Sequence, residues 1–151
     1  MLLGMTDRFF EDYVQDSTQE FGSVKVTEAE IIEFATKYDP QPFHVDPATA
    51  ADGPFGGLIA SGWHTGSLMM KLLAENYLSP VSSLGSPGID ELRWAKPVRP
   101  GDELRIRVRV LEARPSKSKP DRGLLRSLIE VLNQNDEVVF SAVALNFVLR
   151  R

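Results

Sequence analysis

The stretch that decides the fold is VVFSAVALNFVL, from Val138 to Leu149. Apolar side chains occupy both alternating sets of positions, so a strand formed here is central and covered on both faces. Residues 103–110 show the simpler pattern of a half-buried strand, in which charged and aliphatic side chains alternate. Residues 124–132 make a further strand. The chain from about Pro87 onward therefore predicts consecutive strands.

The part of the chain before these strands is interpreted as helices and loops. Thr27 and Glu30 form a capping box that begins one helix. Pro40 forces the residue before it out of the helical region, so this helix ends at Tyr38 or just before it. Asp46-Pro47 combines a cap residue with proline at the first helical position, and it begins a second, short helix.

The longest helix begins after Ser61 and runs to about Tyr77. Helices followed by consecutive strands with short turns predict an α+β fold with an antiparallel sheet. A single long helix covers only one face of a sheet. We therefore expect the other face to meet a second subunit or another segment, and the chain to form an oligomer.

Composition narrows the class of protein. With 151 residues, the chain has the length of one domain spanning 1–151. Seventeen basic and 21 acidic residues give a net charge of −4, which argues against a nucleic-acid partner. The absence of cysteine excludes disulfides and a thiol nucleophile. Met1–Met5 is too short for a signal-peptide core, and no apolar run is long enough to span a membrane, so a cytoplasmic location is expected.

Asp39-Pro-Gln-Pro-Phe-His44 is the segment whose side chains are best suited to catalysis. On a continuous helix, this spacing would place the carboxylate and the imidazole on different faces. The two prolines prevent such a helix, and a turn brings both groups to one place. Histidine side chains titrate near neutrality and a partly buried aspartate can be tuned towards it, which suits general acid/base work on water. The alternative is purely structural, with an aspartate that caps a turn and a histidine packed at a loop.

Gly56-Gly57-Leu-Ile-Ala-Ser-Gly62-Trp63 is the second such segment. Glycines allow a backbone to pass close to a ligand, and a helix N-terminus presents free N–H groups. These donors suit a thioester carbonyl that gains enolate character. The alternative is a glycine-rich turn that simply begins a buried helix. Together, the two segments supply what hydration of a conjugated thioester needs, without a metal or a redox cofactor.

Three motifs resemble the (R)-specific enoyl-CoA hydratase and MaoC-like dehydratase family. Asp39–His44 resembles its Asp-x-Asn-Pro-x-His motif, and Gly57–Gly62 resembles its Gly-x-Ile-Ala-His-Gly segment. Lys96–Asp102 is similar to the Pro-Val-x-Pro-Gly-Asp turn of hot-dog domains. The resemblance implies a hot-dog fold, in which an antiparallel sheet wraps around a long central helix and the chain usually forms a dimer.

The resemblance also implies roles for individual residues. Asp39 and His44 correspond to the catalytic pair, and the Gly62 N–H corresponds to the oxyanion donor. The remaining residues expected at the substrate site are Gln41, Pro42, Phe43, Gly57, Ile59, Ala60, Ser61 and Trp63. Gln41 and Ser61 depart from the family's usual asparagine and histidine, which bears on substrate identity more than on the type of reaction.

The expected substrate is an acyl-CoA or acyl-carrier thioester, so coenzyme A enters only as part of the substrate. The expected reaction is hydration of a 2-enoyl-thioester, or dehydration of the 3-hydroxyacyl-thioester, as part of fatty acid metabolism. Two alternatives remain: a hot-dog thioesterase, and a non-catalytic subunit that binds acyl-CoA beside a catalytic partner. Many hot-dog thioesterases carry a carboxylate on or just before the central helix. The sequence from Phe55 to Leu73 contains no Asp or Glu, which argues against a thioesterase. His64 is interpreted as structural. Arg93 and Trp94 are expected on a strand near the cleft and are left without a role.

Overall fold

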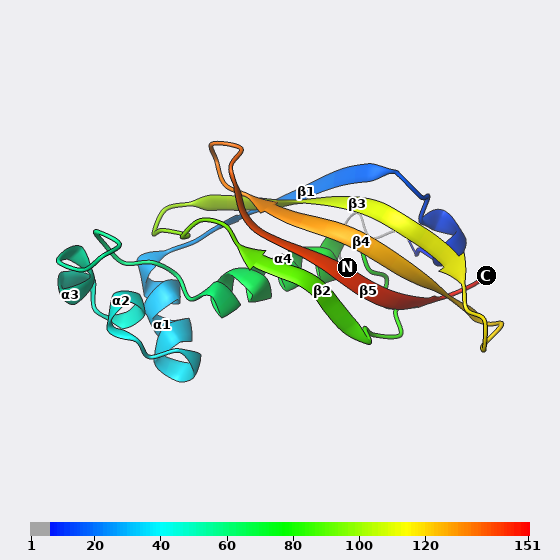
Figure 1. Cartoon of the computed structure of the whole chain (residues 1–151), viewed down its shortest axis with the longest axis horizontal. Coiled ribbons are helices and arrows are strands. Elements are labelled where there is room, and N and C mark those ends of the chain that lie inside the picture. Colours follow the sequence, from blue (N-terminus) through cyan, green and yellow to red (C-terminus); the bar gives the residue numbers. More distant parts are fainter. Residues whose placement is uncertain (1–6) are drawn as a thin grey trace.

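The structure is a computed structural model that describes residues 7–151. The Met1–Met5 segment lies outside the described residues. Figure 1 shows one antiparallel sheet that curves over a long helix, with the shorter helices gathered at one end of the molecule. The predicted α+β class is confirmed by this arrangement.

The sheet contains five strands in the order β1-β3-β4-β5-β2, and every neighbouring pair is antiparallel. Their bounds are β1 Thr18–Lys25, β2 Gly88–Trp94, β3 Glu103–Pro115, β4 Arg122–Leu132 and β5 Val138–Leu149. The range of β5 agrees with the prediction, whereas β3 extends further, to Pro115, because its pairing with β4 resumes after a register shift between Val110 and Glu112. β5 lies between β4 and β2, so it is an interior strand as its sequence indicated.

The core lies between the inner face of the sheet and the helix α4 (Gly62–Asn76). Ile106, Val131 and Phe140 stand in register on three neighbouring strands, and each is at most 1% exposed. From α4, Met69, Leu72 and Leu73 pack against this face. Because burial of each such side chain contributes roughly 1.5–3 kcal/mol, this layer anchors α4 firmly to the sheet.

The outer face of β5 meets its prediction only in part. Val143 on this face is 4% exposed, but Leu145 and Phe147 are half-buried. In Figure 1, α4 lies against the other face of the sheet, and α1, α2 and α3 lie beyond one end of it. Within residues 7–151, no labelled helix therefore covers the outer face.

β1 corrects the interpretation of the first part of the chain as helices and loops. Thr18–Lys25 is a strand that pairs with β3 at the edge of the sheet. Of its side chains, only Phe21 and Val24 are even half-buried. An edge strand with so little buried surface lacks the alternation by which the other strands could be predicted.

The short helices are η1 Phe10–Asp12, α1 Glu28–Tyr38, α2 Pro42–Val45 and α3 Pro47–Ala51. The Thr27 cap of α1 is confirmed, since its side chain accepts from the Glu30 N–H. α1 ends at Tyr38 as expected, and this last residue is 71% exposed. α2 was not predicted; Pro42 occupies its first turn, where a missing N–H costs nothing. No helix among the described residues has the length and apolar character needed to cross a membrane.

Candidate active site

A cavity of about 350 Å³ opens where the first turn of α4 meets α2 and the loop between β2 and β3. Backbone hydrogen bonds join these segments. The Ile59 N–H donates to the Phe43 carbonyl over 3.1 Å, and the Ala60 N–H donates to the Val98 carbonyl over 2.8 Å. The cavity is lined by Asp39, His44, Phe55, Ile59, Ala60, Gly62, Trp63, Thr65, Trp94, Ala95, Lys96, Pro97 and Val98.

Asp39 stands at the C-terminal end of α1. Its backbone leaves the helical region, with φ −155° and ψ 65°, as the following Pro40 requires. Its N–H still donates to the Ala35 carbonyl over 2.8 Å, so the residue remains attached to the helix. The carboxylate is therefore held by a helix end rather than by a free loop.

His44 lies in α2 and is 5% exposed. Its Nδ1 is 2.7 Å from the Ile59 carbonyl oxygen; because a carbonyl only accepts, Nδ1 is the donor. This bond turns Nε2 towards Asp39 Oδ2, 3.3 Å away. The Phe43 ring meets the imidazole edge-on, with centroids 4.5 Å apart. The ring of His44 is thus fixed in orientation from two sides.

The Asp39 carboxylate has a hydrogen bond on each oxygen. The Gln41 amide donates to Oδ1 over 2.6 Å, and the Ser61 hydroxyl donates to Oδ2 over 2.8 Å. Burial alone would raise the pKa of Asp39, but these two bonds and the charge of His44 outweigh it and hold the pKa below its usual value. The carboxylate is therefore ionised at neutral pH, and Oδ2 faces both Ser61 and His44.

Gly62 is the first residue of α4 and lines the cavity. The Ser61 hydroxyl accepts from the Trp63 N–H, and the Ser61 carbonyl accepts from the N–H groups of His64 and Thr65. Within the described part of the chain, the Gly62 N–H has no acceptor. It is the free donor of the first helical turn, where the partial positive charge of the helix is concentrated.

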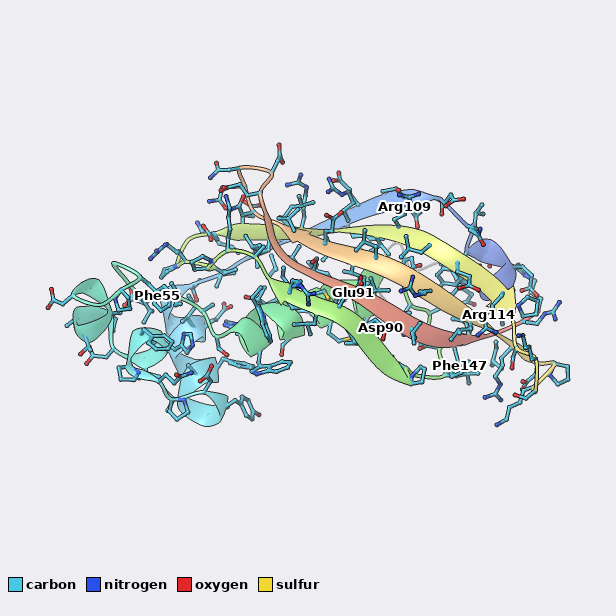
Figure 2. The ribbon with its side chains drawn as sticks, in the orientation of Figure 1. Phe55, Asp90, Glu91, Arg109, Arg114 and Phe147 are labelled. Atoms are coloured by element: carbon cyan, nitrogen blue, oxygen red, sulfur yellow. The ribbon has the colours of Figure 1, made fainter. Side chains whose placement is uncertain are left out.

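Aromatic side chains border this donor and the pair. Phe55, in the loop between α3 and α4, is 39% exposed and stacks edge-on against Phe43 at 5.4 Å. Figure 2 shows Phe55 at the helical end of the molecule, far from Phe147 at the opposite end of the sheet. Trp63 and Trp94 stack edge-on at 5.0 Å and are 60% and 45% exposed. The cavity thus has a polar base and apolar sides.

The residues expected from the sequence fall into two groups. Those that line the cavity are Asp39, His44, Gly62, Ile59, Ala60 and Trp63. The others lie behind it: Gln41 and Ser61 hydrogen-bond to Asp39, Phe43 packs on His44, Pro42 begins α2, and Gly57 lies beside the Arg99 side chain.

Sequence reasoning missed part of the cavity wall. Phe55 and Thr65 line it, together with the segment from Ala95 to Val98. Trp94 was expected near the cleft, and it also lines the cavity. The motif Lys96–Asp102 indicated a turn, but nothing in its spacing indicated that the turn would face Asp39. Among residues 7–151, no cluster of three or more histidine, aspartate or glutamate side chains is placed to hold a metal ion.

The fold and this site define a hot-dog domain with an Asp–His pair at the N-terminus of its central helix. The sequence model of the MaoC like domain matches residues 11–129, and the chain belongs to this family. The chain is similar to the MaoC-like dehydratase from Rhodospirillum rubrum, with 41% identity, a TM-score of 0.88 and coverage of 95% of this chain and 98% of that one.

Two further proteins are similar over most of their length. The 3-hydroxybutyryl-CoA dehydratase of Methylorubrum extorquens is 29% identical over 91% of this chain and 82% of its own. The unliganded R-hydratase PhaJ1 from Pseudomonas aeruginosa has a TM-score of 0.79 and 26% identity, covering 95% of this chain and 86% of that one. Proteins named as hydratases and dehydratases thus share the family with this chain.

Proposed function

We propose that the protein is a hydro-lyase that adds water to a 2-enoyl-thioester, or removes it from a 3-hydroxyacyl-thioester. One observation carries the proposal. A carboxylate and an imidazole 3.3 Å apart share a cavity with the free N–H of Gly62. The names of the similar dehydratases and of the R-hydratase support the same class of reaction.

In the proposed reaction, the Asp39–His44 pair takes one proton from water while the water oxygen bonds to the β-carbon. The electrons of the double bond move towards the thioester, and the carbonyl oxygen gains negative charge that the Gly62 N–H stabilises. The pair then returns one proton to the α-carbon, so the number of protons on the pair as a whole is unchanged. Since the two groups are coupled, the proton is assigned to the pair and not to one member.

Gln41 and Ser61 take a positioning role in this proposal. Each donates to a different oxygen of Asp39, so the carboxylate cannot rotate away from His44 without loss of a hydrogen bond. Ser61 is completely buried and also caps α4. Its replacement of the family's usual histidine therefore preserves a donor at this place.

We propose as well that the chain acts as a homodimer or a higher homo-oligomer. β2 is an edge strand of the described sheet, and its Ile89 is 50% exposed. On the neighbouring α4, Trp63 and Met70 are 60% and 45% exposed. A second copy would cover these apolar side chains. Light scattering after size-exclusion chromatography tests this, and a monomeric wild type that keeps full activity would refute it.

The proposed reaction is tested with crotonyl-CoA and longer or branched enoyl-CoAs. Loss of the conjugated enoyl absorbance without release of thiol is the expected result. Thiol release would assign the protein to the thioesterases instead. Silence in both assays across carriers, in a protein that binds butyryl-CoA, would leave the non-catalytic binding subunit as the function.

A further inference from the structure

Trp94 at the end of β2 presses against the first residue of α4. A methyl group on the Gly62 Cα would lie 2.5 Å from the indole Nε1 and 2.5 Å from Cε2. Trp63 packs on the same indole at 5.0 Å and Phe140 at 6.1 Å, both edge-on. Any residue larger than glycine at position 62 would displace the indole from this place.

The Trp94 indole N–H is a donor without an acceptor in the described part of the chain. An indole nitrogen donates and never accepts, so the acceptor for this N–H must be water or a bound molecule. Trp94 is 45% exposed and lines the same cavity as Asp39, His44 and Gly62. The free donor thus belongs to a side chain in the wall of the candidate active site.

The two free donors are close enough to share one acceptor. The Gly62 amide nitrogen lies about 2.5 Å from the position of that added methyl group, so it is at most about 5 Å from the indole nitrogen. One oxygen accepting two hydrogen bonds of about 2.9 Å spans donors up to about 5.8 Å apart. A carbonyl oxygen has two lone pairs and accepts two such bonds.

We propose that the indole N–H of Trp94 donates to the thioester carbonyl oxygen together with the N–H of Gly62, as a second oxyanion donor. This inference rests on the proposed hydration. A pair of donors meets the charge that develops on the oxygen when water attacks the β-carbon. The position of Trp94 also explains why glycine is needed at residue 62, since a larger residue would push the second donor away from the first.

The kinetic test removes only the N–H. The chain has two tryptophans, so in Trp63→Phe the remaining one is Trp94. Growth with benzothienylalanine replaces its N–H by sulfur at nearly constant shape, and the same variant with ordinary tryptophan is the matched control. We expect kcat to fall about tenfold with KM unchanged, less than the 10²–10³ typical of an enclosed donor, because water reaches this one.

Trp94→Phe in the natural background should show the same fall in kcat. A kcat within twofold of the control in both backgrounds would overturn the inference. An increase in KM with kcat intact would also overturn it, since the indole would then hold the substrate equally in both states. Absence of hydration in the wild type is a different result and counts against the proposed function.

A second measurement does not depend on turnover. Trp63→Phe labelled with ¹⁵N gives a single indole N–H resonance, and butyryl-CoA serves as an inert thioester. A downfield proton shift on binding is expected when the N–H donates to the carbonyl oxygen. Calorimetric binding of butyryl-CoA with an unmoved resonance, or no binding at all, would refute the second donor. A shifted resonance in a protein without hydratase activity would keep the donor and reject the reaction.

Discussion

The helical end and the sheet of this protein are built in different ways. In the sheet, position follows from burial: Ile106, Ile129 and Phe140 all point inward and are at most 1% exposed. At the helical end, position follows from single hydrogen bonds, such as those from Gln41 and Ser61 to Asp39. Figure 2 shows the two regions at opposite ends of the long axis, with Phe55 at one and Arg114 at the other.

On the proposed function, this difference predicts that the chemistry and the stability depend on separate residues. Removal of a core side chain should lower the free energy of unfolding. The molecules that remain folded should keep the Asp39–His44 geometry. Removal of a polar group that neither caps a helix nor packs in the core should lower the rate and leave the free energy of unfolding nearly unchanged. The following variants test this separation.

Asp39→Asn should have the largest effect. The substitution keeps the shape of the side chain but removes its charge and its ability to take a proton. We expect the hydration rate to fall about a thousandfold, within the range of general acid/base catalysis. Circular dichroism should show an unchanged fold, and the melting temperature should stay close to that of the wild type. A folded variant with the wild-type rate would exclude Asp39 from the reaction.

Ile129→Ala tests the sheet. Ile129 is 1% exposed in the middle of β4, and truncation leaves a cavity in the core. We expect a loss of about 2–5 kcal/mol in the free energy of unfolding by urea denaturation. At low temperature, the kcat of the folded fraction should equal that of the wild type. A large fall in kcat without loss of stability would show that the two regions are not separate.

Ser61→Ala tests a residue that belongs to both regions, since Ser61 is completely buried and also hydrogen-bonds to Asp39. Loss of the hydroxyl removes a bond that lowers the pKa of Asp39, so this pKa should rise. Activity that needs the ionised carboxylate is lost as pH falls through that pKa, and the acid limb of kcat/KM should move to higher pH. Gln41→Ala is the comparison: its amide bond to the other carboxylate oxygen lowers the same pKa at least as much, so its loss should move the limb in the same direction. Equal profiles for wild type and Ser61→Ala would refute the positioning role.

Replacement of His64 should have the smallest effect, which is on the pH dependence of stability. It stacks on Phe34 at 4.9 Å, and its Nδ1 is buried without a partner among the described residues. Burial lowers the pKa of His64 below 6.5, although the charge of Glu30 raises it in part. The unfolded chain then binds a proton more readily, so stability should fall as pH drops below about 6.5.

The measurement for His64 is urea denaturation at pH 7.5 and pH 5.5. His64→Phe keeps a ring against Phe34 and should lose less stability between these two values than the wild type does. Carboxylates with a lowered pKa, such as Asp39, change the stability of the protein only in more acidic solution than this. An identical loss in both proteins would show that His64 binds its proton equally in the folded and unfolded chain.

Much of the fold was predictable because local patterns were strong. The strand β5 and the Thr27 cap appear in the structure at the expected residues, although the outer face of β5 is covered only in part. β1 was not predictable, since its register is set by β3 and not by its own apolar content. The α+β class depended only on the interior strands and the long helix, and for this reason it was predicted correctly.

The site also contains features that the sequence indicated and features that it did not. The two prolines between Asp39 and His44 indicated a turn, and the structure places the two side chains 3.3 Å apart. The Ser61–Asp39 bond joins residues 22 positions apart, and Trp94 reaches Gly62 from another strand. Such contacts arise only when the chain is folded, and no spacing in the sequence signals them.

The backbone bonds between α2 and the segment before α4 also bear on how this protein could vary. The Phe43–Ile59 and His44–Ile59 bonds fix both ends of the intervening segment, residues 45–58. The entropy of closing a flexible loop rises only by about 0.6 kcal/mol for each doubling of its length. Insertions at the exposed Asp52, directly after α3, should therefore add little loop-closure free energy and leave the two ends in place. The segment is a natural point at which a peptide tag, or a longer cover over the cavity, could be accommodated.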